Sequence, residues 1–286
     1  MSIAADTQET IGVTGASGYL GSRIADHLEA LGYPVIRLVR NPRSGSDERA
    51  WSLADTPDAT LLSDVDLLIH CAWDMRESAR DAVFATNVAG TERLLDAARN
   101  AGVKRQMLIS SMSAYSGCES NYGQAKLAAE KLAGQSGDAI IIRPGLVYGD
   151  APGGVVGAML GIARITPVMP MIGLGNFQLY TCHEDDLLEL IAYCVRTSDG
   201  LPDEPLLAAA SQSIAFRDVI RRLARRRLLF IPIPWRLVWL LLKGAEALGL
   251  RSRIKSDSLI GLVRSDPAPD FSATARLPIS FRSLLR

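Results

Sequence analysis

Three side chains in one stretch of the sequence have the types that proton transfer requires. Tyr122 and Lys126 form a Y-x-x-x-K pair, and a spacing of four places both on one face of a helix. A nearby ammonium favours the phenolate and lowers the pKa of a tyrosine, so Tyr122 would serve as an acid or base near neutral pH. Ser111 lies 11 residues before Tyr122, at the end of a predicted strand, where its hydroxyl can hold a substrate oxygen.

A glycine-rich turn near the start of the chain has the spacing of a phosphate-binding loop. Residues 14–21 read TGASGYLG, between a predicted strand at 10–13 and a predicted helix at 19–31. The three glycines are Gly15, Gly18 and Gly21. Such glycines permit a tight turn, a close approach of the backbone to a pyrophosphate, and packing of the helix on the strand. Since a helix N-terminus also attracts phosphates, the turn predicts a bound dinucleotide.

The residues that end the next predicted strand, 35–39, favour one form of this cofactor. NAD enzymes usually carry Asp or Glu there to bind the ribose 2′-hydroxyl, but this chain has Val39 followed by Arg40. A guanidinium can pair with a 2′-phosphate, so we predict NADP in preference to NAD. The alternative is that Arg40 is only a solvated loop residue.

The elements that must position these residues alternate between strand and helix patterns. Predicted strands lie at 10–13, 35–39, 66–71, 106–110 and 139–142, and predicted helices at 19–31, 87–100 and 122–132. This alternation predicts an α/β fold, a Rossmann-type doubly wound parallel sheet. We expect an NAD(P)-binding domain at 1–150. A smaller, mostly helical substrate-binding region follows at 151–286, part of which may return to the sheet.

Composition narrows the class of protein further. The 286 residues are 48% hydrophobic and 22% charged with zero net charge, which excludes a disordered chain and argues against a general nucleic-acid binder. The four cysteines form no C-x-x-C pair, so neither a disulfide framework nor a metal site is predicted. No signal peptide is recognised at the start, so we expect a cytoplasmic location.

The second half carries an apolar stretch and a basic one. Residues 228–242 form a 15-residue apolar stretch interrupted by Arg236, which is too short to span a membrane, and we expect a buried helix or a dimer surface in preference to membrane contact. Residues 215–255 hold 11 Lys and Arg against 2 Asp and Glu, which favours an anionic substrate over a merely solvated surface.

Six ordered motifs resemble the extended short-chain dehydrogenases/reductases of the NAD(P)-dependent epimerase/dehydratase family. They are TGASGYLG at 14–21, DVDLLIHCAW at 64–73, NVAGTERLLDAA at 87–98, ISSMSAY at 109–115, YGQAK at 122–126 and RPGLVYG at 143–149. A weaker similarity is HEDDL at 183–187, in which His183 would be structural.

This resemblance implies roles for individual residues. The catalytic set would be Ser111, Tyr122 and Lys126, with Lys126 also binding the nicotinamide ribose. The cofactor-binding set would be Gly15, Ser17, Gly18, Tyr19, Leu20, Gly21, Arg40, Cys71, Ala72, Trp73, Asn87, Lys126 and Pro144. The resemblance also implies a homodimer.

Departures from the family pattern bear on the substrate. Met112 and Ser113 stand where family dehydratases carry Asp-Glu, so we discount dehydration. Leu146 stands where members that act on sugar nucleotides often carry Asn, which weakens the case for a sugar-nucleotide substrate.

The predicted function is hydride transfer to or from a keto or carbinol carbon, with a nucleotide-linked sugar as the leading substrate. Three alternatives stay open. They are a nucleotide-sugar C4 epimerase with bound NAD, an NADPH-dependent reductase of a non-sugar ketone or aldehyde, and a non-catalytic NADP-sensing protein.

Overall fold

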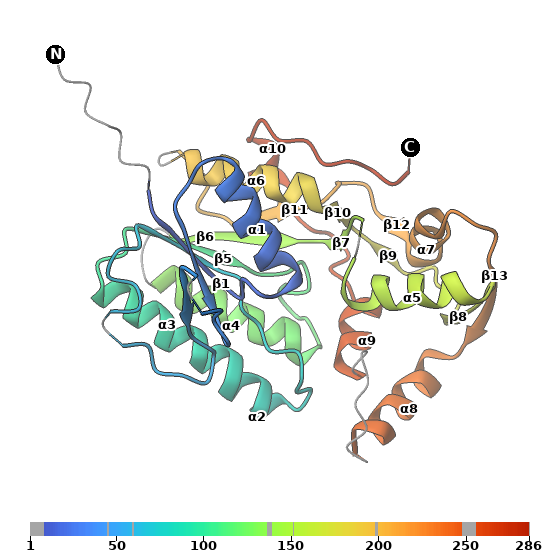
Figure 1. Cartoon of the computed structure of the whole chain (residues 1–286). Coiled ribbons are helices and arrows are strands. Elements are labelled where there is room, and N and C mark those ends of the chain that lie inside the picture. Colours follow the sequence, from blue (N-terminus) through green and yellow to red (C-terminus); the bar gives the residue numbers. More distant parts are fainter. Residues whose placement is uncertain are drawn as a thin grey trace. The chain divides into compact units, whose positions relative to one another are not determined.

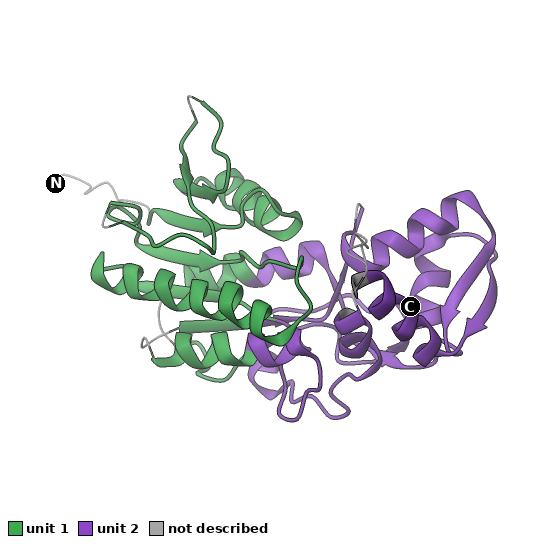
Figure 2. Cartoon of the chain, turned by 90° about the horizontal axis from the view of Figure 1, so that it is seen from below, with its two compact units in different colours: residues 1–110, 127–142, 191–205 green, residues 111–126, 143–190, 206–286 purple. Residues whose placement is uncertain are grey.

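The computed structural model describes residues 9–44, 46–58, 60–135, 139–150, 152–197, 200–247 and 256–285 (Figure 1). The chain forms two compact units (Figure 2): 1–110, 127–142 and 191–205 make the first, and 111–126, 143–190 and 206–286 the second. Each unit takes segments from both halves of the sequence. The division into a cofactor region at 1–150 and a substrate region at 151–286 therefore stays a proposal about function.

A parallel sheet is the centre of the first unit. Its strands are β1 (Ile11–Thr14), β2 (Val35–Val39), β3 (Glu48–Ala50), β4 (Leu67–His70), β5 (Arg105–Ile109) and β6 (Ala139–Pro144). With β11 (Leu206–Ala208) they form a seven-stranded sheet in the order β11-β6-β5-β4-β1-β2-β3. The chain runs from β1 to β2 and β3, then returns to the other side of β1 for β4, which creates the switch point of a doubly wound fold. The predicted Rossmann-type sheet is confirmed.

The helices of this part follow the predicted pattern closely. They are α1 (Tyr19–Ala30), α2 (Arg80–Val83), a π-helical turn η1 (Phe84–Val88), α3 (Ala89–Asn100), α4 (Asn121–Gln135) and α6 (Glu184–Arg196). α1 buries Ile24 and Leu28 at helical spacing and ends before Gly32, whose φ of +93° suits glycine. The predicted start of the third helix at Asn87 falls inside η1.

The sheet is buried on both faces, which explains the apolar runs of its strands. Ile11, Val13, Leu67 and Ile69 are fully buried. One core cluster packs Leu38 and Leu68 against Leu94 and Ala98 of α3, together with Trp51 from the loop after β3. Another joins Leu95 and Leu108 to Ala129 and Ala133 of α4.

The second unit combines helices with short strand pairs. Its elements are β7 (Leu146–Tyr148), α5 (Gly154–Ile165), β8 (Val168–Ile172), β9 (Gln178–Leu179), β10 (Thr181–His183), β12 (Ile214–Ala215), α7 (Phe216–Ala224), β13 (Leu229–Ile233), α8 (Trp235–Ala247), α9 (Ser256–Val263) and α10 (Ser272–Ala275). β10 pairs with β7, β12 with β9, and β13 with β8. Met159, Met169, Met171 and Phe216 form its core.

The apolar stretch at 228–242 does not form the predicted buried helix. It is β13 followed by α8, with Pro234 directly before α8, a position where the missing N–H of proline costs no helical hydrogen bond. Leu240 and Leu241 of α8 are 59% and 65% exposed, so the prediction of burial is wrong, and the alternative of a dimer surface stays a prediction. Of the basic stretch, residues 248–255 lie outside the described residues.

No helix in the described ranges is both long and apolar enough to cross a membrane. The same ranges contain no cluster of three or more His, Cys, Asp or Glu side chains that could hold a metal ion.

Candidate active site

The glycine turn of the first unit leaves no room for side chains at two of its glycines. Gly15 has a φ of +67°, and a Cβ there would lie 2.8 Å from the Cα of Ala72. A Cβ at Gly21 would lie 2.2 Å from the carbonyl oxygen of Gly15. The N–H of Gly18 donates to that same oxygen at 2.8 Å, which closes the turn. These contacts give Gly15 a turn role and Gly21 a helix-packing role.

The surface of this turn is open at the N-terminus of α1. Ser17 and Gly18 are exposed, and Tyr19 and Leu20 are half-buried. Gly18 occupies the N-cap position and brings no side chain to the free N–H groups of the first turn. A pyrophosphate can accept hydrogen bonds at this position, so these residues fit the dinucleotide that the sequence predicts.

The end of β4 is fixed beside the turn by Thr14. The Thr14 hydroxyl accepts hydrogen bonds from the N–H groups of Cys71 and Ala72, each at 3.1 Å. It also lies 2.7 Å from Nδ1 of His70, whose Nε2 lies 3.0 Å from the Thr91 hydroxyl. This buried polar chain aligns the ends of β1 and β4, and the sequence analysis did not single out His70 or Thr14 for it.

Asn87 is fully buried in η1, and its amide holds the loop that follows β4. Its Oδ1 accepts from the N–H of Asp74 at 2.7 Å. Its Nδ2 donates to the carbonyl oxygens of Asp74 and Val83 at 3.1 and 3.2 Å. The place predicted for Asn87 near the nicotinamide side of the cofactor stays a prediction, and so does that of Cys71, Ala72 and Trp73 along the adjoining ribose.

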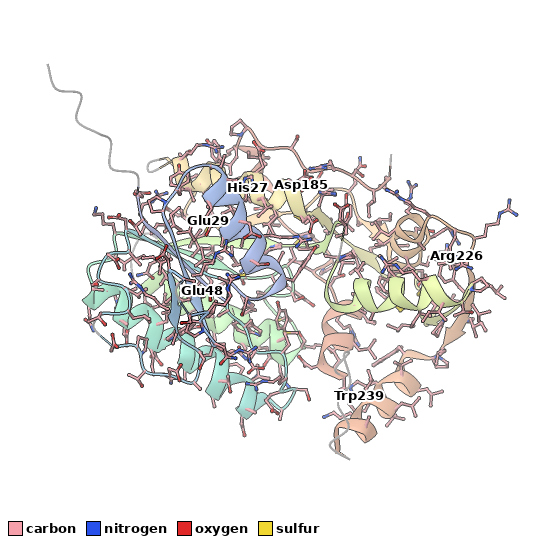
Figure 3. All side chains as sticks on the ribbon, viewed as in Figure 1. His27, Glu29, Glu48, Asp185, Arg226 and Trp239 are labelled. Carbon is pink, nitrogen blue, oxygen red and sulfur yellow. The ribbon has the colours of Figure 1, made fainter. Side chains whose placement is uncertain are left out.

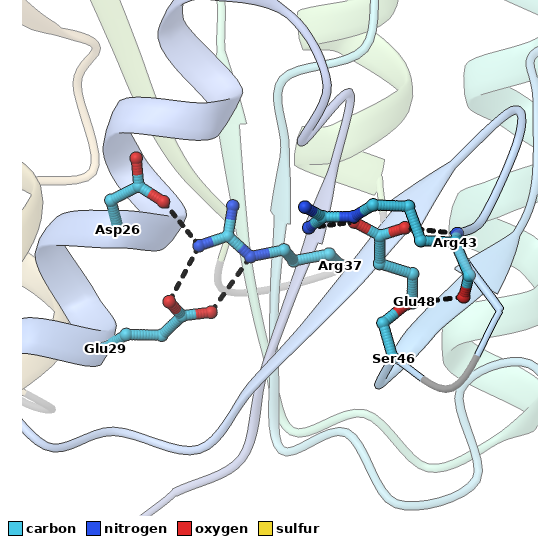
Figure 4. A network of polar contacts seen from close by, with 6 residues as sticks. All are labelled: Asp26, Glu29, Arg37, Arg43, Ser46 and Glu48. Carbon is cyan, nitrogen blue, oxygen red and sulfur yellow. Dashed lines mark hydrogen bonds and ion pairs between the residues drawn. The ribbon is translucent and has the colours of Figure 1, made fainter.

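The arginines around the end of β2 differ in their partners (Figure 4). Arg37 is held by Asp26 at 2.6 Å and Glu29 at 2.7 Å, and hydrogen bonding to Glu29 in particular raises the pKa of its guanidinium. Arg43 pairs with Glu48 at 2.7 Å. Arg40 is exposed and has no hydrogen bond or ion pair within the described part of the chain, which leaves its guanidinium available to a ligand.

Arg40 acts electrostatically on Asp74, in the loop after β4. The pKa of the Asp74 carboxyl is lowered, chiefly by its hydrogen bonds with the Arg76 guanidinium and to a smaller extent by the charge of Arg40. Because β1 and β2 are parallel neighbours with Thr14 opposite Leu38, the glycine turn and Arg40 follow their strands at the same edge of the sheet.

Ser111, Tyr122 and Lys126 all lie in the second unit. The Lys126 Nζ lies 6.0 Å from the centroid of the Tyr122 ring, as the four-residue spacing predicts. Lys126 is only 3% exposed whereas Tyr122 is half-buried, so a shielded ammonium stands beside a phenol that solvent reaches. The Ser111 hydroxyl accepts from the N–H of Ser113 at 3.1 Å, which leaves its hydrogen to donate.

A buried carboxylate that the sequence analysis missed fixes the start of α4. The two oxygens of Asp257, in α9, accept from the N–H of Asn121 at 2.7 Å and of Tyr122 at 2.9 Å. Asp257 is 8% exposed, and a carboxylate at a helix N-terminus is favoured by the helix dipole. Asp257 therefore positions the backbone of Tyr122. The local sequence carries no signal for it, because the two residues are 135 positions apart.

Two further predicted residues have structural contacts. Pro144 is buried at the end of β6, and its carbonyl oxygen accepts from the N–H of Met112 at 3.0 Å, next to Ser111. The predicted place of Pro144 beside the nicotinamide stays a prediction. His183 accepts from the N–H of Asp185 at 3.2 Å, which caps the first turn of α6 and agrees with a structural role.

The chain is similar to known proteins in sequence. Residues 11–206 match the sequence profile of the NAD dependent epimerase/dehydratase family. A ceramide reductase of Caulobacter vibrioides is 28% identical over 201 residues, which cover 67% of this chain and 63% of that protein. The chain thus spans slightly less than two thirds of that relative. A UDP-glucose 4-epimerase of Vibrio cholerae is 24% identical over 247 residues, or 76% of this chain and 75% of that one.

Solved structures share the fold. The UDP-glucuronic acid 4-epimerase of Bacillus cereus, in complex with UDP-glucuronic acid and NAD, aligns with a TM-score of 0.67 at 18% identity. The alignment covers 92% of this chain and 95% of that one.

Proposed function

The chain belongs to the NAD-dependent epimerase/dehydratase family, and on that premise we propose that it transfers hydride to or from a keto or carbinol carbon, with Tyr122 as acid and base. The observation that carries this proposal is the buried Lys126 ammonium 6.0 Å from the ring of a solvent-accessible Tyr122. This pair lies on a helix whose start is fixed by Asp257.

In the direction of reduction, the glycine turn and Arg40 would hold a nicotinamide dinucleotide, which when bound would supply the hydride that the carbonyl carbon receives. The Tyr122 hydroxyl gives its proton to the carbonyl oxygen, so the ketone becomes an alcohol and Tyr122 becomes a phenolate. Lys126 stabilises that phenolate by its charge. The Ser111 hydroxyl donates a hydrogen bond to the same substrate oxygen and holds it near Tyr122. Protonation of the phenolate from solvent restores the starting state.

We propose NADP as the preferred cofactor because Arg40 is the available guanidinium at the end of β2. Arg40→Ala is expected to remove a preference for NADPH over NADH of at least about tenfold, or about 1.4 kcal/mol. Titration of the purified protein by fluorescence, with NADPH and NADH in parallel, measures both affinities. Arg43→Ala is the matched control, because Glu48 already holds the Arg43 guanidinium. An Arg40→Ala protein that keeps the preference would contradict the assignment, and copurified NAD would favour the epimerase.

Two substrate classes follow from the sequence, and the residues of this chain favour the second. A nucleotide-linked sugar is supported by the names of the Vibrio and Bacillus relatives. A non-sugar ketone is supported by Leu146 in place of Asn, by the exposed apolar side chains of α8, and by the name of the Caulobacter reductase. We therefore propose reduction of an apolar ketone, with the nucleotide sugar as the second candidate.

A panel of substrates separates the two. NADPH consumption is expected with medium-chain ketones such as 2-decanone and not with UDP-glucose or UDP-galactose. Conversion of UDP-glucose into UDP-galactose without net consumption of NADPH would instead establish a C4 epimerase.

A homodimer in the cytoplasm remains our proposal from the family resemblance, and sedimentation of the purified protein tests the oligomeric state.

A further inference from the structure

An apolar pocket lies between two helices of the second unit. It has a volume of about 320 Å³ and is lined by Trp235, Trp239 and Leu240 of α8 and by Ile260 and Val263 of α9. Small-molecule pockets span about 300–1,000 Å³, so this one suits a single short apolar group. Trp239 is labelled in Figure 3.

The polar groups of this pocket are few and specific. The Nε1–H of Trp239 is buried and has no hydrogen-bond partner among the described residues. Because that nitrogen is itself fully buried, the Trp239 ring lines the pocket without offering a hydrogen-bond donor to a ligand there. Three charged residues also line the pocket: Arg264 and Glu119 pair with each other at 3.2 Å, and the Arg236 guanidinium lies over the Trp235 ring, 5.8 Å from its centroid.

The wall of the pocket is connected to the helix that carries Tyr122. α9 supplies Ile260 and Val263 to the pocket and Asp257 to the N–H groups at the start of α4. Glu119 lies three residues before Tyr122 in the sequence. The Tyr115 hydroxyl donates to the carbonyl oxygen of Arg264 at 3.1 Å, which fixes α9 to the loop between Ser111 and Tyr122. A ligand in the pocket therefore contacts the same framework that positions the proposed acid/base.

We propose that this pocket binds the hydrocarbon chain of the substrate, so that the substrate is an amphiphilic ketone or carbinol with an apolar tail. This proposal rests on the function proposed above. Aliphatic walls from Leu240, Ile260 and Val263 suit a chain, whereas for a nucleotide diphosphate Arg236 is the one lining cation without an ion pair among the described residues. The part of a longer chain beyond the pocket would meet Leu237, which is 48% exposed on α8.

Direct binding tests the pocket without any need for turnover. Titration of the full-length protein with 2-decanone, followed by tryptophan fluorescence, is expected to show saturable quenching. Leu240→Asp places a charge in the lining and is expected to weaken binding at least tenfold. Leu241→Asp is the matched control, because Leu241 is on the same helix but does not line the pocket, and its affinity is expected to stay at the wild-type value. Both positions are exposed, so both variants are expected to fold.

The outcomes separate this proposal from the proposed function. Equal affinities of the two variants, absence of quenching by 2-decanone, or quenching by UDP in its place would overturn the pocket assignment. Reduction of ketones with a KM that does not fall as the chain lengthens would also overturn it, while leaving the oxidoreductase function intact. Saturable, Leu240-dependent binding without any turnover would support the pocket and contradict the function.

Discussion

Tyr122→Phe is expected to lower kcat by roughly 10²- to 10⁴-fold, the range for loss of a general acid, and to leave the affinity for NADPH unchanged. The substitution removes only the hydroxyl. The ring that lies 6.0 Å from the Lys126 Nζ remains, and the glycine turn belongs to the other compact unit. Steady-state kinetics with a saturating ketone, together with a fluorescence titration of NADPH, measure the two quantities separately.

Tyr180→Phe is the control for this prediction. Tyr180 lies in the same unit and is half-buried like Tyr122. Its ring packs against that of Phe271, with 5.4 Å between the ring centroids. Its loss of a hydroxyl is expected to leave kcat at the wild-type value. Equal losses in the two variants would mean that the tyrosine hydroxyls matter for folding and not for proton transfer. A Tyr122→Phe protein with full activity would remove Tyr122 from the mechanism.

The same pair of variants addresses the non-catalytic alternative. A protein that only senses NADP would need the glycine turn and Arg40, but it would gain nothing from a phenol beside a buried ammonium. Lys126 is only 3% exposed beside that phenol. A catalytic role for the neighbouring phenol gives that arrangement a purpose, and a complete loss of turnover in Tyr122→Phe would exclude the sensor.

The sequence predicted the sheet and its flanking helices because their patterns are strong and local. The strand at Leu67–His70 is buried at all four positions and apolar at the first three, as expected for a strand covered on both faces. In the helix at Tyr19–Ala30, Leu20, Ile24 and Leu28 follow one another every four residues, and Ile24 and Leu28 are buried. Both signals depend only on neighbours in the chain, and so does the four-residue spacing of Tyr122 and Lys126.

The second unit was predicted less well because its exposed faces are also apolar. α5 buries Val156, Met159 and Ala163, but Ile165 just beyond them is 88% exposed. Apolar residues on both faces of a helix conceal the periodicity that identifies it. The exposed leucines of α8 had the same effect, which made a surface helix look like a buried one.

Other features depend on contacts between distant parts of the chain. Asp257 caps a helix that begins 136 residues earlier, and the Thr14–His70 contact joins the ends of two strands 56 residues apart. Neither has a short motif. The side chains that orient the proposed site therefore could not be predicted from the sequence. The proposed acid Tyr122, the ammonium of Lys126 and the phosphate-binding turn could be.

Gly21→Ala is expected to have the second large effect, on both stability and cofactor binding. The added methyl would lie 2.2 Å from the carbonyl oxygen and 2.7 Å from the carbonyl carbon of Gly15, both backbone atoms that cannot turn aside. Overpacking of this kind costs about 1–3 kcal/mol, and we expect the upper part of that range. The turn must shift to relieve the contact, so the affinity for NADPH is expected to fall at least tenfold.

Gly134→Ala provides the opposite result for the same chemical change. Gly134 also lies within a helix, α4, but a Cβ there meets nothing within 4 Å. Alanine stabilises a helix interior by about 0.8–1.0 kcal/mol relative to glycine, and Gly134 lies in the last turn of α4, so this variant is expected to gain stability up to that amount and to bind NADPH equally well. Urea unfolding measures stability and the fluorescence titration measures binding. Opposite signs of the two stability changes would establish that the close approach of α1 to the Gly15 carbonyl, and not helix propensity, requires glycine at position 21. Changes of equal sign and size would show that the turn yields to a methyl group, and the packing role of Gly21 would have to be abandoned.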